Sequence, residues 1–303
     1  MRRTEQWIPT VSESSSCELG EGPHWDPERA QLLWVDILAG RVHIGEVAGP
    51  SVEITRTLDA GRHVGAVVPW VGGGWLAAAA QGFIHIAEDG TVVELAQPEI
   101  ATGHRTRMND GKCDPQGRFW AGSMAYDEIP GAGSLYRLDL DGSITGVLSD
   151  VTISNGLGWS PDGRTMYITD TGRGRIDAYD FDGATGAIGN RRDFLVGLDA
   201  SGAPDGLTVD ADGRIWTAIW GGGAVLRVDP RGRLIGRVDV PVSQPTSCCF
   251  GGPDLTTLFI TTARDGLSPD DLASQQQAGM LLQCAPGVKG LPAMPFKGEL
   301  PAG

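Results

Sequence analysis

The chain has 303 residues, 45 of them glycine and 19 proline, and a formal net charge of −14 at pH 7. So acidic a chain is repelled by phosphate backbones and anionic lipids, which argues against nucleic acid or a membrane surface as a partner. It has no apolar run of the roughly 18 residues that a membrane helix needs and no apolar core of a secretory signal, which predicts a cytoplasmic protein.

From the N-terminus, residues 7–12 are the first segment with the pattern of a strand. Beyond it, an aromatic residue ends a short apolar run six times, at intervals of 41 to 49 residues. These aromatics are Trp34, Trp75, Trp120, Tyr167, Trp216 and Phe259. A period in the forties that is carried by strands and turns is typical of propeller blades. The sequence therefore predicts an all-β fold, a six-bladed β-propeller of four-stranded antiparallel sheets.

The whole chain, residues 1–303, is expected to form one propeller domain. The open edges of the first and last sheets would be exposed unless a further strand joined them. We therefore expect the N-terminal segment to close the ring against the last blade. A strand pattern also recurs after each aromatic strand, at residues 40–46, 82–88, 134–139, 175–180, 224–229 and 279–284. Most of these runs lead into Asp- and Gly-containing turns that suit hairpins.

The Asp-x-Asp-Gly turns also invite comparison with calcium-binding EF-hand loops. Such a loop has glycine at its sixth position, where this chain has Ile144 and Ile215, so we interpret the segments as hairpin turns. Residues 268–279 could hold one or two helical turns, because Ser-Pro-Asp-Asp is typical of a helix start. The five cysteines, an odd number, are expected to be reduced thiols packed in the core or in strands.

An oxygen-bearing side chain precedes a glycine where each of four predicted inner strands begins. The residues are Glu21, Asn109 or Asp110, Asn155 and Asp205. Equivalent strand starts in a propeller face the same end of the central channel, so Glu21, Asn155 and Asp205 should converge from the first, fourth and fifth blades. Two carboxylates and an amide oxygen suit Ca²⁺, Mg²⁺ or Mn²⁺ and tolerate Zn²⁺ or Fe²⁺. Asn-Gly and Asp-Gly are also common turn dipeptides, so these residues alone leave a turn role open.

Seven short segments, in their order and spacing, resemble one protein family. They are residues 21–25 (EGPHW), 107–118 (RMNDGK with DP and GR), 154–160 (SNGLGWS), 204–207 (PDGL), 246–252 (TSCCFGG), 263–266 (ARDG) and 287–290 (GVKG). The chain resembles the senescence-marker-protein/gluconolactonase/luciferin-regenerating family, and the resemblance covers nearly its whole length. It implies a six-bladed propeller with one divalent cation in the channel, held by Glu21, Asn155 and Asp205.

The resemblance also implies which residues bind substrate. The family's arginine and asparagine fall on Arg107 and Asn109. In some members an acidic residue after a Gly-x-Met segment holds the sugar. Here Asp127 is the expected equivalent, and the neighbouring Glu128 is the alternative.

These parts predict hydrolysis of a sugar aldonolactone, of the gluconolactone, xylonolactone or arabinonolactone type, to the aldonic acid. A divalent cation (Ca²⁺, Zn²⁺, Mn²⁺, Mg²⁺ or Fe²⁺) would polarise the ester carbonyl and make water more acidic, and Asp205 is the expected general base. Arg107 and Asn109 would orient the sugar hydroxyls. A phosphotriesterase-like hydrolase and a non-catalytic calcium-binding propeller remain alternatives. No Gly-x-Ser-x-Gly or His-Glu-x-x-His motif favours another hydrolase.

The histidines carry weaker signals. His43 and His85 occupy equivalent positions in the first two repeats and are expected to pack within blades. His24 and His63 lie near inner-strand starts and could line the channel, with a structural role more typical of such positions. His104 precedes Arg107 in a segment that could cover the pocket.

Overall fold

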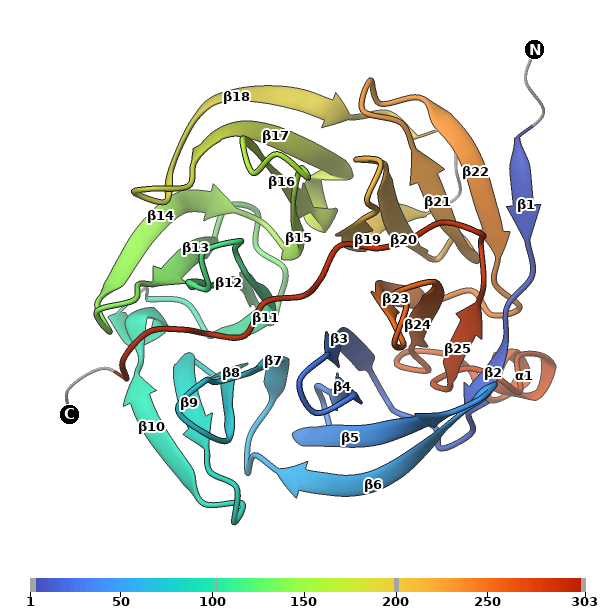
Figure 1. The fold of residues 1–303 in the computed structure, drawn as a ribbon, viewed down its shortest axis with the longest axis horizontal. Coiled ribbons are helices and arrows are strands. Elements are labelled where there is room, and N and C mark those ends of the chain that lie inside the picture. The colour runs from blue at the N-terminus through green and yellow to red at the C-terminus, as the bar shows by residue number, and fades with distance from the viewer. Residues whose placement is uncertain (1–3, 102, 199–201, 301–303) are drawn as a thin grey trace.

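A computed structural model describes residues 4–101, 103–198 and 202–300. Six sheets are arranged around a central axis, as predicted, and Figure 1 looks along that axis. The ends of the predicted domain, residues 1–3 and 301–303, lie outside the described residues. Within the part of the chain that is described, no helix has the length and apolar composition needed to cross a membrane.

Each blade runs outward from an inner strand beside the axis. Blade one contains β3 (Gly20–Asp26), β4 (Gln31–Asp36), β5 (Arg41–Ala48) and β6 (Ser51–Asp59). Blade two contains β7 (Val64–Pro69), β8 (Trp75–Ala79), β9 (Gly82–Ile86) and β10 (Val92–Ala96). Blade three contains β11 (Thr106–Cys113), β12 (Phe119–Ala125), β13 (Gly133–Leu138) and β14 (Ile144–Val151). Blade four contains β15 (Ser154–Trp159), β16 (Thr165–Asp170), β17 (Arg175–Asp182) and β18 (Ala187–Leu195).

The last two blades include strands from the N-terminus. Blade five contains β19 (Ala203–Val209), β20 (Ile215–Trp220), β21 (Ala224–Val228) and β22 (Leu234–Asp239). Blade six contains β23 (Pro245–Gly251), β24 (Thr257–Thr262), β25 (Leu281–Cys284) and, as its outermost strand, β2 (Thr10–Glu13). The strand β1 (Glu5–Trp7) adds a fifth, parallel strand to blade five beside β22, which the four-stranded prediction did not include.

Strand β2 pairs antiparallel with β25, so the first and last parts of the chain share one sheet. The hydroxyl of Ser12 donates to the side-chain carbonyl of Gln283 at 3.0 Å, which adds a buried polar tie to the backbone pairing. Around the axis, each inner strand contacts the next, and β23 contacts β3. The hydroxyl of Thr246 donates to the carbonyl of Gly20 at 2.6 Å across this last junction.

All six periodic aromatics lie on the second strand of a blade, as the sequence repeat predicts. In two blades the indole N–H donates to an aspartate in the turn before that strand. Trp120 donates to Asp114 at 3.0 Å and Trp216 to Asp210 at 3.1 Å. Each aspartate is fully buried and also caps its turn by accepting from backbone N–H groups. The repeat is therefore a packing and hydrogen-bonding unit that joins turn to strand.

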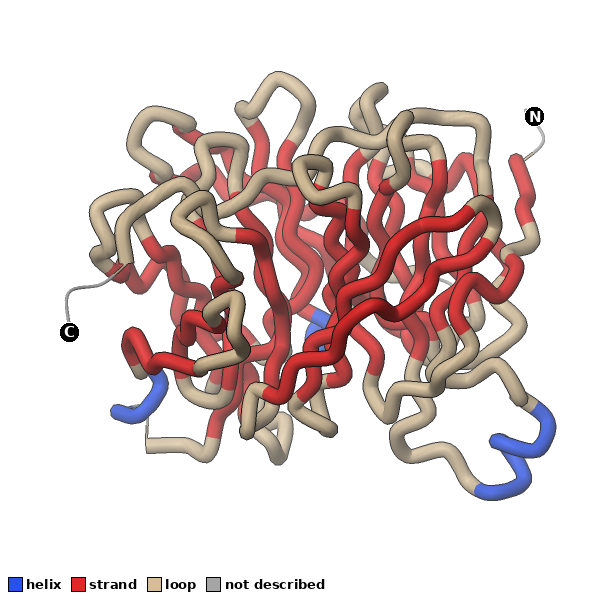
Figure 2. The backbone as a smooth tube through the Cα atoms, turned by 60° about the horizontal axis from the view of Figure 1, so that its bottom comes forward, coloured by secondary structure: helices blue, strands red, loops and turns tan. Residues whose placement is uncertain are grey.

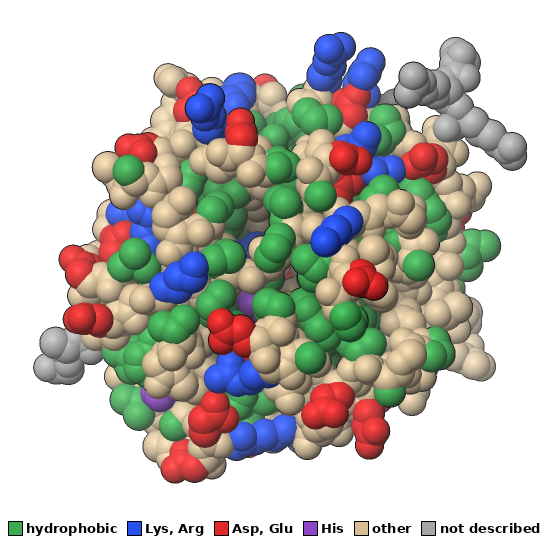
Figure 3. All heavy atoms as spheres, viewed as in Figure 1, with side chains coloured by type: hydrophobic (Ala, Val, Ile, Leu, Met, Phe, Trp, Pro, Cys, Tyr) green, Lys and Arg blue, Asp and Glu red, His purple; other side chains and the backbone are tan. Residues whose placement is uncertain are grey.

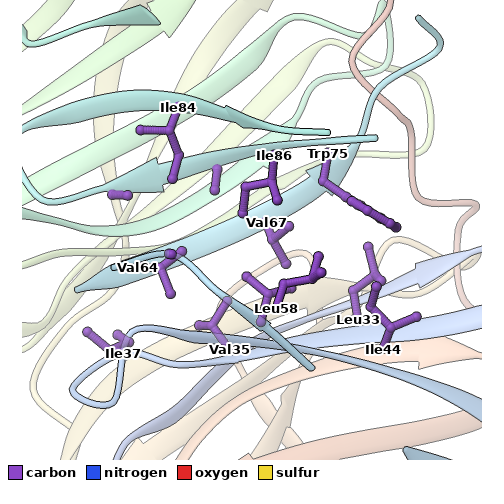
Figure 4. Close-up of a cluster of buried hydrophobic side chains, with 14 of the residues drawn as sticks. Leu33, Val35, Ile37, Ile44, Leu58, Val64, Val67, Trp75, Ile84 and Ile86 are labelled. Carbon is purple, nitrogen blue, oxygen red and sulfur yellow. The ribbon is translucent and has the colours of Figure 1, made fainter. Parts of the chain in front are cut away.

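Apolar side chains fill the spaces between neighbouring blades. Figure 4 shows the cluster between blades one and two, where Leu33, Ile44 and Leu58 face Val67 and Ile86. Figure 2, turned from the axial view, shows the strands running between loops at the two faces of the ring. The interleaved packing holds the inner strands at fixed positions around the axis.

Other features follow the sequence predictions. The short helix α1 (Pro269–Ser274) begins with a reciprocal capping box between Ser268 and Asp271, and two 3₁₀ turns span Pro98–Ala101 and Thr171–Arg173. All five cysteines are free and buried. His43 stacks on Trp34, and His85 packs edge-on against Trp70, so both histidines pack within blades.

Candidate metal centre and substrate pocket

Every inner strand departs from regular pairing near its N-terminal end. The register shifts fall between Glu21 and His24 in β3, Val64 and Ala66 in β7, Met108 and Gly111 in β11, Ser154 and Leu157 in β15, Pro204 and Leu207 in β19, and Pro245 and Ser247 in β23. A β-bulge turns side chains out of the ladder and is common beside active sites. The predicted polar residues therefore sit in, or at the edge of, bulges facing one channel.

The turn interpretation of the Asn-Gly and Asp-Gly pairs is wrong, because Gly156 and Gly206 lie inside β15 and β19. Their role is close approach between neighbouring strands. A Cβ atom on Gly156 would lie 2.5 Å from the backbone nitrogen of Leu207 and 2.6 Å from the backbone oxygen of Asp205. Real Cβ atoms do not come that close to backbone atoms. Glycine here lets β15 and β19 approach each other at the level of the site.

Asn155 and Asp205 meet at this level. The side-chain amide of Asn155 donates to a carboxylate oxygen of Asp205 and to the hydroxyl of Thr171, the latter at 3.1 Å. The Thr171 hydroxyl in turn donates to the carbonyl of Pro204 at 2.8 Å. These bonds fix the amide nitrogen, whereas the Oδ1 atom of Asn155 is buried without a hydrogen-bond partner. A buried acceptor of this kind costs free energy unless something else satisfies it.

Glu21 contributes a second buried carboxylate. It is 4 % exposed, and one of its oxygens accepts from the backbone N–H of Gly22 at 2.7 Å. Burial raises the pKa of Glu21 well above its ordinary value, and the charges of Asp205 and Asp110 raise it further. Burial likewise raises the pKa of Asp205, and Asp110 adds to that effect. Carboxylates that act on one another in this way lie close together and favour a cation between them.

The donor chemistry fits a divalent cation. Two buried carboxylates and an unsatisfied amide oxygen are hard ligands, and a cation held by them would satisfy the Asn155 acceptor and offset the carboxylate charge. Among the described residues, no group of three or more His, Cys, Asp or Glu side chains is arranged to hold a metal. The donor set that fits a cation has only two carboxylates, those of Glu21 and Asp205, and the amide oxygen of Asn155 is its third donor.

Arg107 and Asn109 are linked on the neighbouring inner strand, β11. The Arg107 guanidinium donates to Oδ1 of Asn109 at 2.6 Å, and Nδ2 of Asn109 donates to the carbonyl of Ser154 at 2.9 Å. Both residues are buried. Burial lowers the pKa of Arg107, whereas the nearby Tyr126 and Glu21 raise it. The pair thus presents a buried guanidinium and a fixed amide close to Glu21.

The two acidic candidates for binding the sugar are not buried, unlike Glu21, Asn155 and Asp205. Asp127 and Glu128 both lie on the exposed turn after β12. Glu128 is among the carboxylates whose charge raises the pKa of Arg107. The backbone of Glu128 is in the left-handed region, with a φ of 54°, which residues other than glycine adopt less often. The charge of Glu128, the alternative, thus acts on Arg107, although no hydrogen bond or ion pair joins the two among the described residues.

Sequence reasoning missed a contact between two loops beside Arg107. The hydroxyl of Tyr126 and Nδ1 of His63 are 2.9 Å apart, and the guanidinium of Arg105 lies 4.7 Å from the centre of the Tyr126 ring. Burial and the charges of Arg107 and Arg105 lower the pKa of His63. Tyr126 is next to the acidic residues that were singled out, but no local pattern pairs it with a histidine 63 residues away.

The chain is similar to known proteins over most of its length. Residues 19–264 match the family model described as SMP-30/Gluconolactonase/LRE-like region. Regucalcin of Sus scrofa is 39% identical over 291 residues, covering 93% of this chain and 96% of that protein. YvrE of Bacillus subtilis (strain 168), named as a candidate sugar lactone lactonase, is 35% identical over 285 residues, covering 93% of this chain and 96% of that protein.

Two solved structures show the same architecture over almost the full length. A calcium-binding protein, regucalcin, from Agrobacterium tumefaciens strain C58 superposes with a TM-score of 0.91 at 30% identity, covering 98% of this chain and 100% of that one. A luciferin-regenerating enzyme superposes with a TM-score of 0.87 at 30% identity, covering 95% and 99%.

Proposed function

Because the chain belongs to the SMP-30/gluconolactonase/LRE-like family, we propose that it is a divalent-metal-dependent lactonase that hydrolyses a sugar aldonolactone to the aldonic acid. The names of its relatives support a lactonase-family function. The observation that carries the finer proposal is the meeting of Asn155 and Asp205 beside Glu21, with a buried amide oxygen left unsatisfied.

In this proposal Glu21, Asn155 and Asp205 hold one divalent cation. When bound, that cation supplies Lewis acidity, which polarises a carbonyl group and makes water more acidic. The hydrogen bond from Gly22 to Glu21 and the bonds from Asn155 to Asp205 and Thr171 keep the three donors in place before the cation arrives. Such pre-arrangement lowers the cost of ordering the site.

Asp205 acts as the general base. Water adds to the lactone carbonyl carbon, its proton passes to the Asp205 carboxylate, and the bond between that carbon and the ring oxygen then breaks. The departing ring oxygen takes up a proton and becomes a hydroxyl group, which leaves the open-chain acid. A carboxylate in this role contributes about 10²–10⁴-fold to the rate.

Arg107 and Asn109 bind the sugar. One guanidinium nitrogen of Arg107 donates to Asn109 and to the carbonyl of Met108, and the N–H groups on the other two nitrogens remain to meet lactone oxygens. Asp127 or Glu128, on the exposed turn, accepts from a sugar hydroxyl at the channel mouth. The electrostatic link of Glu128 to Arg107 favours Glu128. The substrate is therefore a small polyhydroxylated lactone.

The test measures lactone opening with a pH indicator, using gluconolactone, xylonolactone and arabinonolactone. Protein stripped by a chelator is compared before and after each of Ca²⁺, Zn²⁺, Mn²⁺, Mg²⁺ and Fe²⁺ is returned. Asp205→Ala and Glu21→Ala are expected to abolish the metal-stimulated rate while the far-ultraviolet circular dichroism is unchanged. Glu53→Ala, on the exposed outer strand β6, is the matched control and keeps the rate. Full activity in stripped protein or in both site variants contradicts the proposal.

The same protein preparation distinguishes the lactonase function from two other functions. The all-oxygen donor set also suits Ca²⁺, and the Agrobacterium tumefaciens structure is titled as a calcium-binding protein. A calcium-binding propeller would take up Ca²⁺ in calorimetry without turning over any lactone. A phosphotriesterase-like hydrolase would show a higher kcat/KM for an organophosphate than for every lactone.

A further inference from the structure

A cavity lies toward the end of the inner strands opposite the candidate metal centre. Its volume is about 260 Å³, and its walls include His24, Lys112, Trp159, Phe250, Leu291 and Met294. None of the proposed metal ligands lines it. Gly158, in its wall, is three residues beyond Asn155 along β15, which places the cavity roughly 10 Å further along the axis at about 3.3 Å per residue. We call it the lower pocket.

The C-terminal segment crosses this end of the ring. Figure 1 shows it passing in front of the inner strands, and Figure 3 shows the same face hollowed near its middle and surrounded by hydrophobic side chains. The segment is anchored on one side where Gly290 donates to the carbonyl of Leu255 at 2.8 Å. On the other side, Phe296 donates to the carbonyl of Pro69 at 2.8 Å.

Between these anchors, residues 291–295 make no backbone hydrogen bonds within the described part of the chain. Leu291, Pro292, Ala293 and Met294 thus roof the lower pocket without sheet pairing. A flexible methionine side chain adapts readily to different apolar partners. The roof is held by backbone hydrogen bonds at both ends, and between them Leu291 and Met294 pack against the apolar clusters of neighbouring blades.

Several polar groups stand among the apolar walls: Lys112, His24, the hydroxyl residues Ser160 and Thr208, and the indole N–H of Trp159, which is buried without a hydrogen-bond partner. The ammonium group of Lys112 donates to the carbonyl of Leu207 at 2.7 Å, which uses one of its three N–H groups, and it forms no ion pair among the described residues. His24 is 5 % exposed, and its Nε2 atom is buried without a hydrogen-bond partner. Two carboxylates act on these groups: Asp26 acts on His24 and is already paired with Arg29 at 2.9 Å, and the buried Asp110 interacts with the charge of Lys112. The positive charge of Lys112 is therefore the available anchor.

We propose that the lower pocket is a second binding site, which takes a small monocarboxylate with an apolar ring or chain. The carboxylate would bind the free N–H groups of Lys112, and the apolar part would pack against Trp159, Phe250 and the roof. Ligand pockets elsewhere combine mostly apolar walls with a few placed polar groups in this way.

Isothermal titration calorimetry with 2-naphthoate tests the proposal, and neutral 2-naphthamide is the matched probe. Wild-type protein is expected to bind 2-naphthoate saturably and at least tenfold more tightly than the amide. Lys112→Met should weaken naphthoate binding about tenfold or more and leave amide binding nearly unchanged. Ala293→Trp, which fills the pocket from the roof, should weaken both probes. Lys297→Met, an exposed lysine further along the same segment, is the control and should change neither.

Arg107→Met distinguishes the two ends of the channel, since Arg107 is the other buried cation near the axis. Unchanged naphthoate binding in this variant supports the lower pocket. Loss of binding in Arg107→Met, unchanged binding in Ala293→Trp, or no saturable binding to wild-type protein overturns the proposal. If Lys112→Met does not fold, because its bond to Leu207 spans the channel, Ala293→Trp and Arg107→Met decide the question on their own. None of these outcomes depends on lactone hydrolysis.

Discussion

The side-chain amide of Asn155 donates a hydrogen bond to the carboxylate of Asp205 across the junction between blades four and five. Since the amide nitrogen is engaged by Asp205 and Thr171, the opposite end of the amide group, Oδ1, is the end left free. The arrangement therefore decides which atom of Asn155 is available as a donor to a cation. It depends on how closely β15 and β19 approach each other.

We predict that Gly156→Ala weakens cation binding. Its new Cβ would meet backbone atoms of Leu207 and Asp205 at 2.5 and 2.6 Å, so β19 would have to move and take Asp205 with it. Calorimetric titration of the chelator-stripped variant should show at least a tenfold weaker affinity for the activating cation than the wild type. Gly189→Ala, on the outer strand β18 with nothing within 4 Å of its Cβ, should match the wild type. Equal affinities in both variants would show that the approach of the strands is unimportant.

Asn109→Ala is expected to act mainly on substrate binding. The substitution removes the acceptor that holds the Arg107 guanidinium at 2.6 Å and the tie from Nδ2 to the carbonyl of Ser154. A guanidinium that is free to swing binds lactone oxygens less well, so KM should rise about tenfold, with a smaller change in kcat. Steady-state kinetics with the preferred lactone measure both. Gln116→Ala, in an exposed turn, is the control, and a fall in kcat alone would contradict this role.

The blade repeat could be predicted from the sequence because one physical unit recurs. A turn aspartate, an aromatic residue and a strand occupy the same relative positions in two of the blades, where Trp120 and Trp216 mark equivalent places. The convergence of Glu21, Asn155 and Asp205 followed from the same logic, since equivalent strand starts share one end of the axis.

Other features were hidden from the sequence for definite reasons. An Asn-Gly pair is compatible with either a turn or a bulge, and only the pairing of β15 with β16 distinguishes them. The parallel contact of β1 with β22 joins segments more than two hundred residues apart and carries no local pattern. The contact between His63 and Tyr126 likewise depends on where two loops from different blades end.

The buried aspartate of the repeat should be important for stability. Asp114 accepts from the indole of Trp120 at 3.0 Å and from Nε of Arg118 at 2.6 Å, and it is fully buried. Asp114→Ala leaves a buried guanidinium and an indole N–H without their acceptor, which should lower the free energy of unfolding by roughly 3–5 kcal/mol. Urea denaturation provides the measurement. Asp162→Ala, in the corresponding turn of blade four where Tyr167 replaces the tryptophan, should cost about 1 kcal/mol or less. Similar losses in the two variants would argue against the indole contact as the cause.

His24 should make the protein less stable as the pH falls. Burial, aided by the charge of Lys112, lowers the pKa of His24 from 6.5 to about 4 in the folded protein. Between these two pH values the unfolded chain takes up a proton that the folded protein does not. The free energy of unfolding therefore decreases as the pH decreases. The stabilisation from a neutral His24 is complete above pH 6.5 and is lost progressively down to pH 4.

The His24→Gln variant isolates this contribution. On moving from pH 7 to pH 5, the wild type should lose about 2 kcal/mol more of its free energy of unfolding than the variant, because glutamine does not titrate. Urea denaturation at the two pH values gives the difference. His85→Gln controls for the substitution itself, since His85 bonds the carbonyl of Gly73 at 3.1 Å and is only partly buried. A His24→Gln variant with the same pH dependence as the wild type would show that His24 takes up its proton equally well in the folded and the unfolded protein.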